Sequence, residues 1–257
     1  MGFLSEVVAG VRRELERRPL DDASLLARVH SSPPPRDFVG ALRRGPVPAV
    51  IAEVKRASPS AGPIAERDPA ERARAYEVGG AAALSVLTEP RHFGGSLADL
   101  RAARWAASLP VLRKDFIVHP AQLLESRAAG ADAVLLIAAA LADDELSALL
   151  ALARDLGLGV LLEVHTEEDL ERALGTEAEV VGVNARDLET LQVDGEGALR
   201  LLGRVPGDRV AVLESGISRP EQAARAVSAG ARALLVGEAL MRAEDPAALI
   251  RALRGVA

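Results

Sequence analysis

The stretch AGADAV at residues 129–134 joins the end of a helical pattern to the start of an apolar run. Two similar stretches, GGAAAL at 79–84 and AGARAL at 229–234, begin 50 residues before it and 100 residues after it. In each stretch, a glycine that can end a helix is followed at once by a predicted strand. Both spacings are whole multiples of a βα unit of roughly 25 residues. The repeat therefore predicts a chain built from consecutive βα units.

Apolar runs and amphipathic helical patterns alternate along the chain on both sides of this stretch. The runs are continuously apolar, which is typical of parallel strands buried on both faces. The predicted strands cover residues 49–54, 82–87, 110–113, 133–137, 159–163, 180–183, 210–214 and 233–236. The helical patterns between them include 69–78, 97–106, 121–129, 143–156 and 220–229. Eight such units in about 200 residues predict an α/β fold of the (β/α)8 TIM-barrel type.

An open, doubly wound sheet is the alternative architecture for this alternation. No Gly-x-Gly-x-x-Gly follows the first predicted strand, which disfavours that sheet and argues against a dinucleotide cofactor.

The N-terminal part of the chain has a different pattern. Residues 1–30 predict two helices, and three consecutive prolines at 33–35 end them. We therefore expect a single domain over residues 1–257, with a helical extension at 1–47 and the barrel at 48–257. The charges of Glu6, Arg12 and Arg13 interrupt any signal-peptide core, and no run of 18 uncharged apolar residues occurs. These features predict a cytoplasmic protein without a membrane partner.

Composition excludes several classes of function. The net charge of -6 and an aromatic content of 2% argue against a nucleic-acid partner. The absence of cysteine excludes disulfide scaffolds and cysteine metal sites. No two histidines stand four residues apart, so we expect no metal. We expect a monomer or weak homo-oligomer that acts on a small molecule.

The basic residues are distributed unusually, because 29 of the 31 are arginine and only Lys55 and Lys114 are lysine. Both lysines fall at ends of predicted strands, where the active site of a barrel lies. A guanidinium stays charged, whereas an ammonium can give up a proton. The two lysines are therefore candidates for a general acid, a Schiff base or an anion-binding group.

Other polar residues occupy the same strand ends. Functional loops of a barrel carry carboxylates and other polar side chains at these ends. The candidates here are Glu53, Glu163, Asn184, Arg186 and Glu214. The loops after the last two strands contain glycine at the start of a helix, a pattern typical of phosphate binding. Of the histidines, His119 is expected to be structural, and His165, although near Glu163, is expected to lie in the loop after its strand.

The stretch IAEVKRASPS at residues 51–60 resembles the first-strand signature of indole-3-glycerol phosphate synthases. Further stretches are similar to that family in the same order along essentially the whole chain: LSVLTE (84–89), HFGGS (92–96), RKDFI (113–117), LEVH (162–165), GVN (182–184), RDLETL (186–191), ESGI (214–217) and VGEALM (236–241). Ala185 and Leu213 depart from the family pattern, which has a polar and a small residue there.

The resemblance implies a carboxy-lyase of tryptophan biosynthesis. Its substrate would be 1-(2-carboxyphenylamino)-1-deoxyribulose 5-phosphate, closed to indole-3-glycerol phosphate with loss of CO₂ and water by general acid–base catalysis. Lys114 would be the acid, and Lys55 would bind the substrate carboxylate or share that role. Glu163 would act in deprotonation and dehydration, assisted by Glu53.

The resemblance also implies binding roles and no cofactor. Asn184, Arg186 and Glu214 would orient the substrate. Its aromatic ring would lie in an apolar slot made by Phe93, Phe116, Leu135 and Leu188. The phosphate would be held by Ser58, Ser215, Gly216, Gly237 and the backbone N–H of Glu238, whose side chain would point away.

Three other interpretations of the same residues stay open. One is a sugar-phosphate isomerase barrel, which needs an acid and a base but no paired lysines. Another is a Schiff-base aldolase in which Lys114 attacks a carbonyl. The last is a non-catalytic phosphate-binding barrel.

Overall fold

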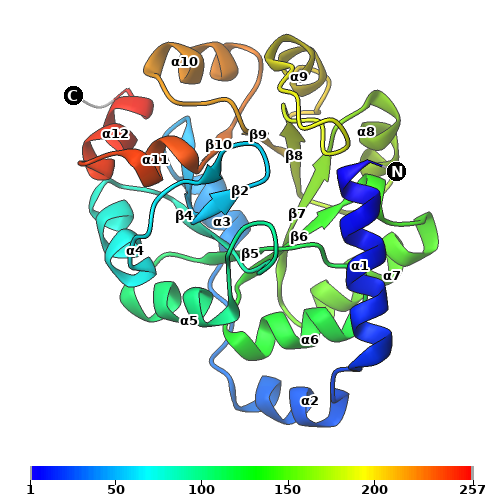
Figure 1. Ribbon diagram of the computed structural model, residues 1–257. Coiled ribbons are helices and arrows are strands. Elements are labelled where there is room, and N and C mark those ends of the chain that lie inside the picture. The colour runs from blue at the N-terminus through cyan, green and yellow to red at the C-terminus, as the bar shows by residue number, and fades with distance from the viewer. Residues whose placement is uncertain (1, 256–257) are drawn as a thin grey trace.

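The computed structural model describes residues 2–255 and contains a closed barrel of eight parallel strands (Figure 1). The barrel strands are β1 (Ala49–Val54), β4 (Ala83–Leu87), β5 (Val111–Lys114), β6 (Ala133–Ile137), β7 (Gly159–Val164), β8 (Val180–Asn184), β9 (Val210–Glu214) and β10 (Ala233–Val236). Strand β1 pairs with β4 on one side and with β10 on the other, which closes the barrel. The TIM-barrel prediction is confirmed, and the open doubly wound sheet is wrong.

The predicted strands differ from the observed ones by one residue at some ends. Three strands continue to the residue after the predicted end, at Lys114, Val164 and Asn184. Parallel pairing explains all three extensions, because Lys114 is in register with Leu87, Val164 with Val183 and Asn184 with Glu214. Polar residues that hydropathy assigns to loops are thus held on strand ends, where their side chains have fixed directions.

Helices surround the barrel and connect its strands (Figure 1). They are α4 (Pro69–Val78), α5 (Leu97–Ala106), α6 (Pro120–Ala129), η1 (Ala138–Ala140), α7 (Asp143–Asp155), α8 (Glu167–Leu174), α9 (Gly195–Leu202), α10 (Pro220–Ser228), α11 (Glu238–Arg242) and α12 (Pro246–Leu253). Among residues 2–255, no helix combines the length and apolar character needed to cross a lipid bilayer.

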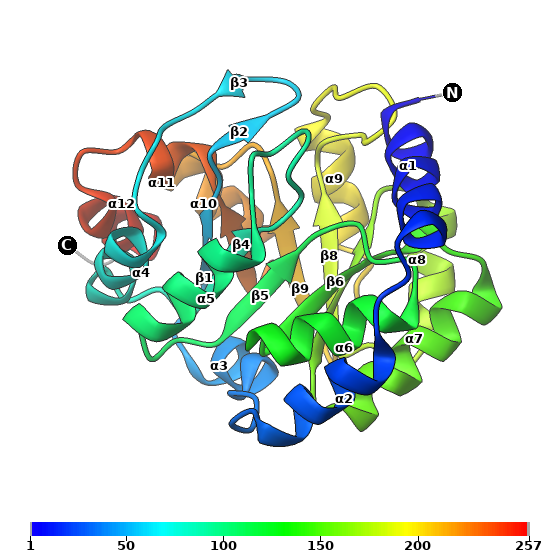
Figure 2. The same cartoon turned by 60° about the horizontal axis from the view of Figure 1, so that its bottom comes forward.

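The N-terminal segment contains α1 (Phe3–Arg17) and α2 (Asp22–Ser31), as predicted, and a further helix, α3 (Phe38–Arg44). Helix α3 was not predicted because its seven residues are too few to show a helical period. Its Phe38 and Leu42 are buried in the same apolar cluster as the inward-facing strand residues. Figure 2 shows α3 at one end of the barrel, opposite the end at which α1 begins.

A short hairpin of β2 (Ala57–Ser58) and β3 (Gly62–Pro63) follows β1 and was also not predicted. It lies at the same end of the barrel as the start of α1 (Figure 2). The hairpin is tied to the loop after β4, since the Ala57 N–H donates to the Phe93 carbonyl over 3.2 Å. The loops at this end therefore contact one another above the strands.

The buried carboxylate of Asp132 connects the N-terminal segment to the barrel. It accepts the backbone N–H of Arg36 at 2.7 Å and that of Val111 at 2.8 Å. Arg104 lies 3.2 Å from the same carboxylate. Burial raises the pKa of Asp132 to about 6, against these favourable contacts.

Replacing Asp132 with alanine is expected to lower the free energy of unfolding by about 2 kcal/mol, because buried donors lose their acceptor. Urea unfolding followed by circular dichroism measures this change. The control is Asp208→Ala, whose carboxylate is largely exposed. Equal unfolding midpoints for the two variants would contradict the connecting role of Asp132.

Candidate active site

A cavity of about 430 Å³ opens at the carboxyl ends of the barrel strands. It is lined by all of the residues that the sequence singled out as catalytic, substrate-binding or phosphate-binding candidates: Glu53, Lys55, Ser58, Phe93, Lys114, Phe116, Leu135, Glu163, Asn184, Arg186, Leu188, Glu214, Ser215, Gly216, Gly237 and Glu238. Residues from distant parts of the chain meet here because parallel strands all end at the same side of a barrel.

The ammonium of Lys114 lies between two buried carboxylates at the bottom of this cavity. Its Nζ donates to Glu163 Oε2 at 2.7 Å and lies 3.0 Å from Glu214 Oε2. Neither oxygen of Glu214 forms a hydrogen bond of good geometry in the described chain. The Glu214 carboxylate is therefore held mainly by charge.

The second lysine, Lys55, also forms an ion pair with a buried carboxylate. Lys55 Nζ lies 3.0 Å from Oε1 of Glu53, whose side chain is only 3% exposed. Ser85 Oγ donates to the other oxygen of Glu53 at 3.3 Å. Both of the chain's lysines are thus paired with carboxylates in one cavity.

Burial and charge shift the ionisation of this cluster. Burial lowers the pKa of Lys114, but the charges of Glu163, Glu214 and Glu53 outweigh it and raise that pKa above its ordinary value. Burial raises the pKa of Glu163, but the Lys114 charge outweighs it and leaves the pKa well below its ordinary value. Burial raises the pKa of Glu214 to about 8, although Lys114 opposes the shift. The contacts thus favour a charged Lys114 beside an ionised Glu163, whereas burial opposes ionisation of Glu214.

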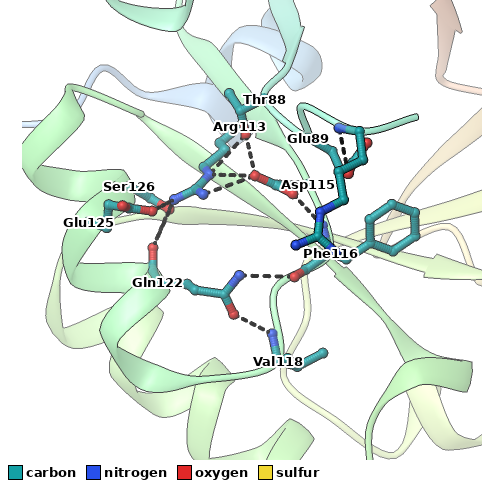
Figure 3. Close-up of polar contacts among 10 residues, drawn as sticks. Thr88, Glu89, Arg113, Asp115, Phe116, Val118, Gln122, Glu125 and Ser126 are labelled. Carbon is teal, nitrogen blue, oxygen red and sulfur yellow. Dashed lines mark hydrogen bonds and ion pairs between the residues drawn. The ribbon is translucent and has the colours of Figure 1, made fainter. Parts of the chain in front are cut away.

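A buried polar network fixes the backbone on which Lys114 stands (Figure 3). The guanidinium of Arg113 donates to Asp115 Oδ2 at 2.9 Å and to Glu125 Oε2 at 2.8 Å. The other oxygen of Asp115 accepts the N–H of Phe116 at 2.9 Å, and Gln122 donates to the Phe116 carbonyl at 3.0 Å. The residues on both sides of Lys114 are therefore restrained, and the Phe116 ring is held at the cavity wall.

The apolar wall contains the four predicted residues and others that were not predicted, among them Phe3 from the N-terminal helix. The Phe3 ring packs edge-on against Phe116, with 6.3 Å between centroids, and against His92 at 5.1 Å. Backbone hydrogen bonds tie α1 to the cavity, since the N–H of Leu4 donates to the carbonyl of Leu188 at 3.1 Å. The N-terminal helix thus contributes directly to the cavity.

The polar loop after β8 is ordered by its own contacts. Asn184 Oδ1 accepts the backbone N–H of Arg186 at 3.0 Å. The Arg186 guanidinium donates to the carbonyl of Leu191 at 2.8 Å, and Leu191 has a positive φ of 62°. Both predicted side chains therefore lie at the cavity, but each also stabilises the loop.

The loop after β9 turns sharply at the cavity. Ser215 and Gly216 have consecutive positive φ angles of 68° and 76°. The loops after the last two strands of a barrel are a recurring place for phosphate binding. On the neighbouring loop, the Glu238 carboxylate pairs with Arg242 at 3.0 Å.

His165 lies in the short loop between β7 and α8, as predicted. Its side chain is only 10% exposed, and Nε2 lies 3.3 Å from Glu163 Oε1. This contact with Glu163 was not predicted. The prediction for His119 is confirmed, since its Nδ1 caps α6 by accepting the N–H of Ala121.

Comparison with known proteins agrees with this geometry. The family model of indole-3-glycerol phosphate synthase matches residues 4–253. The chain belongs to the indole-3-glycerol phosphate synthase family. It is 54% identical to the indole-3-glycerol phosphate synthase of a Nocardioides species, covering 100% of this chain and 99% of the relative. It is 51% identical to that of Micrococcus luteus, covering 99% and 97%.

Solved structures of other proteins share only the fold of this family member. Thiamine phosphate pyrophosphorylase from Pyrococcus furiosus matches with a TM-score of 0.59 at 18% identity, covering 85% of this chain and 96% of that chain. A 3-hexulose-6-phosphate synthase matches with a TM-score of 0.63 at 19% identity, covering 81% and 100%.

One glycine beside Glu214 was not singled out from the sequence. A Cβ atom added to Gly182 on β8 would overlap Oε1 of Glu214 and lie 3.0 Å from Leu161 Cδ1. Only a hydrogen at this position leaves room for the Glu214 carboxylate beside Lys114. Glycine also occurs in strands at bulges and tight bends, so its position in the sequence does not reveal this close approach.

The variant Gly182→Ala is therefore expected to displace Glu214 and to lower kcat/KM about a hundredfold, a typical cost of a misplaced group near the chemistry. The matched control is Gly195→Ala, where an added Cβ meets no atom within 4 Å. Steady-state kinetics on both variants measure the difference. Equal kcat/KM values would show that Glu214 needs no such room.

Proposed function

We propose that the chain converts 1-(2-carboxyphenylamino)-1-deoxyribulose 5-phosphate to indole-3-glycerol phosphate at this cavity. The observation that carries the proposal is the Lys114 ammonium between Glu163 and Glu214, below an apolar wall and in one cavity with the loop after β9. In this reaction the ring carbon that bears the carboxylate bonds to the ketone carbon. CO₂ then leaves that ring carbon, and loss of water completes the indole ring.

Lys114 is assigned as the general acid that protonates the ketone oxygen as the new carbon–carbon bond forms. Its carboxylate neighbours raise its pKa, so the group is in its acid form at neutral pH. A positioned acid or base contributes about 10²–10⁴ in rate. Transfer of the proton to the oxygen turns the ketone into a hydroxyl, which later leaves as water.

Glu163 is assigned as the base that removes the proton lost during dehydration. Its low pKa keeps it ionised, and its position 2.7 Å from Lys114 places base and acid side by side. Glu53 assists through Lys55, whose ammonium lies 3.0 Å away and can bind the substrate carboxylate. Asn184, Arg186 and Glu214 orient the substrate.

The remaining cavity residues bind the two ends of the substrate. The aromatic ring fits against Phe93, Phe116, Leu135 and Leu188, where burial of apolar surface favours it. The phosphate fits the loops after β9 and β10. Hydrogen-bond donors or backbone that can approach the phosphate closely would come from Ser58, Ser215, Gly216, Gly237 and the N–H of Glu238. The Glu238–Arg242 pair keeps the Glu238 charge engaged by a cation.

We also propose that the enzyme works in the cytoplasm as a single barrel domain with its helical extension, as a monomer or weak homo-oligomer. Its net charge of -6 and small phosphorylated substrate give no reason for a nucleic-acid partner. The proposed chemistry asks the protein only for proton transfers that accompany bond formation, loss of CO₂ and loss of water, and it uses no cofactor.

Incubation of the purified protein with the anthranilate deoxyribulose phosphate tests the function. We expect indole fluorescence to appear in the presence of a metal chelator. Folded protein that produces no indole would contradict the proposal. Borohydride added with the substrate separates out the aldolase alternative, since only a Schiff base would leave a mass adduct on Lys114.

A further inference from the structure

His165 is a buried histidine that the proposed chemistry does not use. It stands two residues after Glu163, and its Nε2 lies 3.3 Å from Glu163 Oε1. This nitrogen is shielded from solvent and forms no hydrogen bond of good geometry in residues 2–255. The interaction of Nε2 with Glu163 is thus mainly one of charge.

Glu163 is consequently contacted on both of its oxygens. Oε2 accepts from Lys114 at 2.7 Å, and Oε1 faces His165. Rotation of the carboxyl group would disturb both contacts at once. The imidazole therefore restricts the direction in which Glu163 presents its oxygens to the cavity.

The charged groups that act on His165 are carboxylates from several elements. Glu163 on β7, Asp169 on α8 and Glu214 on β9 all act on its charge, and Asp187 in the loop after β8 is close enough to be affected by it. Burial lowers the pKa of His165, but the contact with Glu163 and the charges of these carboxylates outweigh burial and raise it. The imidazolium form is thus favoured beyond its ordinary range.

The lysines of the cavity leave one side of Glu163 free. Lys114 contacts Oε2 of Glu163, and Lys55 contacts Glu53 instead. An imidazolium on His165 would add a cation on the side of Glu163 that Lys114 does not reach.

We propose that His165 is a positioning residue for the reaction, and that its imidazolium fixes the ionised Glu163 carboxylate beside Lys114. This inference rests on the proposed function. The imidazolium is present below the pKa of His165 and is lost as the pH rises through it. The benefit to turnover is therefore largest at low pH and disappears at high pH.

The test compares His165→Gln with the wild type across pH, using the anthranilate deoxyribulose phosphate as substrate. Glutamine keeps a neutral N–H donor but cannot titrate. We expect kcat to be about tenfold below wild type at about pH 6 and equal to it within about twofold at about pH 9, with KM little changed. His165→Leu cannot carry the charge either, so it should show at least the same loss at about pH 6. His30→Gln is the control, because His30 is exposed.

A ratio of wild-type to His165→Gln kcat that is the same at every pH would overturn the proposal, since a purely structural role predicts a constant ratio. NMR titration of the imidazole provides a measurement that needs no turnover. We expect the His165 pKa to lie above that of His30 and to fall in Glu163→Gln. If the wild-type enzyme does not convert the substrate, the proposed function is wrong. An unchanged His165 pKa in Glu163→Gln would reject the coupling between His165 and Glu163, whether or not the enzyme is active.

Discussion

Replacing Lys114 with arginine is expected to reduce kcat about a thousandfold while leaving the fold intact. Arginine keeps the positive charge between Glu163 and Glu214, so the buried carboxylates stay compensated. A guanidinium does not release its proton at any accessible pH, however, and cannot act as the acid. The expected loss lies within the range of about 10²–10⁴ that a general acid contributes.

Steady-state kinetics of Lys114→Arg measure this loss, and urea unfolding verifies that the variant is folded. The matched control is the reverse exchange at the surface, Arg225→Lys, at a side chain that is 62% exposed and paired with Glu196. This control should retain wild-type kcat. A Lys114→Arg enzyme within about tenfold of wild type would remove Lys114 as the acid.

Replacing Glu163 with glutamine is expected to reduce kcat to a similar extent, about a thousandfold. The amide has nearly the size of the carboxyl group, so packing is preserved, but it accepts no proton. Lys114 also loses the neighbour that contributes most to its raised pKa. The single substitution therefore removes the base and also alters the acid, Lys114.

Two further variants make the Glu163→Gln result specific. Glu163→Asp retains a carboxylate at a shorter reach and should recover part of the lost kcat. Glu177→Gln, at a side chain that is 86% exposed, should have no effect. Normal turnover by Glu163→Gln would mean that another group accepts the proton.

The fold and most of the cavity could be predicted because they depend on local patterns. Continuous apolar runs and the glycines at 80, 130 and 230 mark where strands begin, and the barrel brings their carboxyl ends together. Once the strand ends are known, side chains such as Glu53, Lys114 and Glu214 must face one cavity. The two lysines stood out because arginine carries almost all other positive charge.

The features that escaped prediction depend on contacts between distant segments. Phe3 reaches the cavity only because α1 is tied to the loop that contains Leu188. The contact of the His165 ring with Glu163 was missed because the sequence position of a loop residue does not show where its side chain turns. The need for a glycine at 182 follows from the Glu214 side chain, 32 residues further along the chain. Hydrophobic periodicity and amino-acid composition do not reveal any of these contacts.

The most direct test of the central claim is a single-turnover measurement with substrate that is isotopically labelled in its carboxyl group. Mass spectrometry would follow labelled CO₂ while fluorescence follows the indole product. Wild-type enzyme is expected to release one CO₂ for each indole formed, and Lys114→Arg to release neither in the same time. Absence of labelled CO₂ from the wild type, or equal release by both enzymes, would contradict decarboxylative ring closure at the Lys114 site.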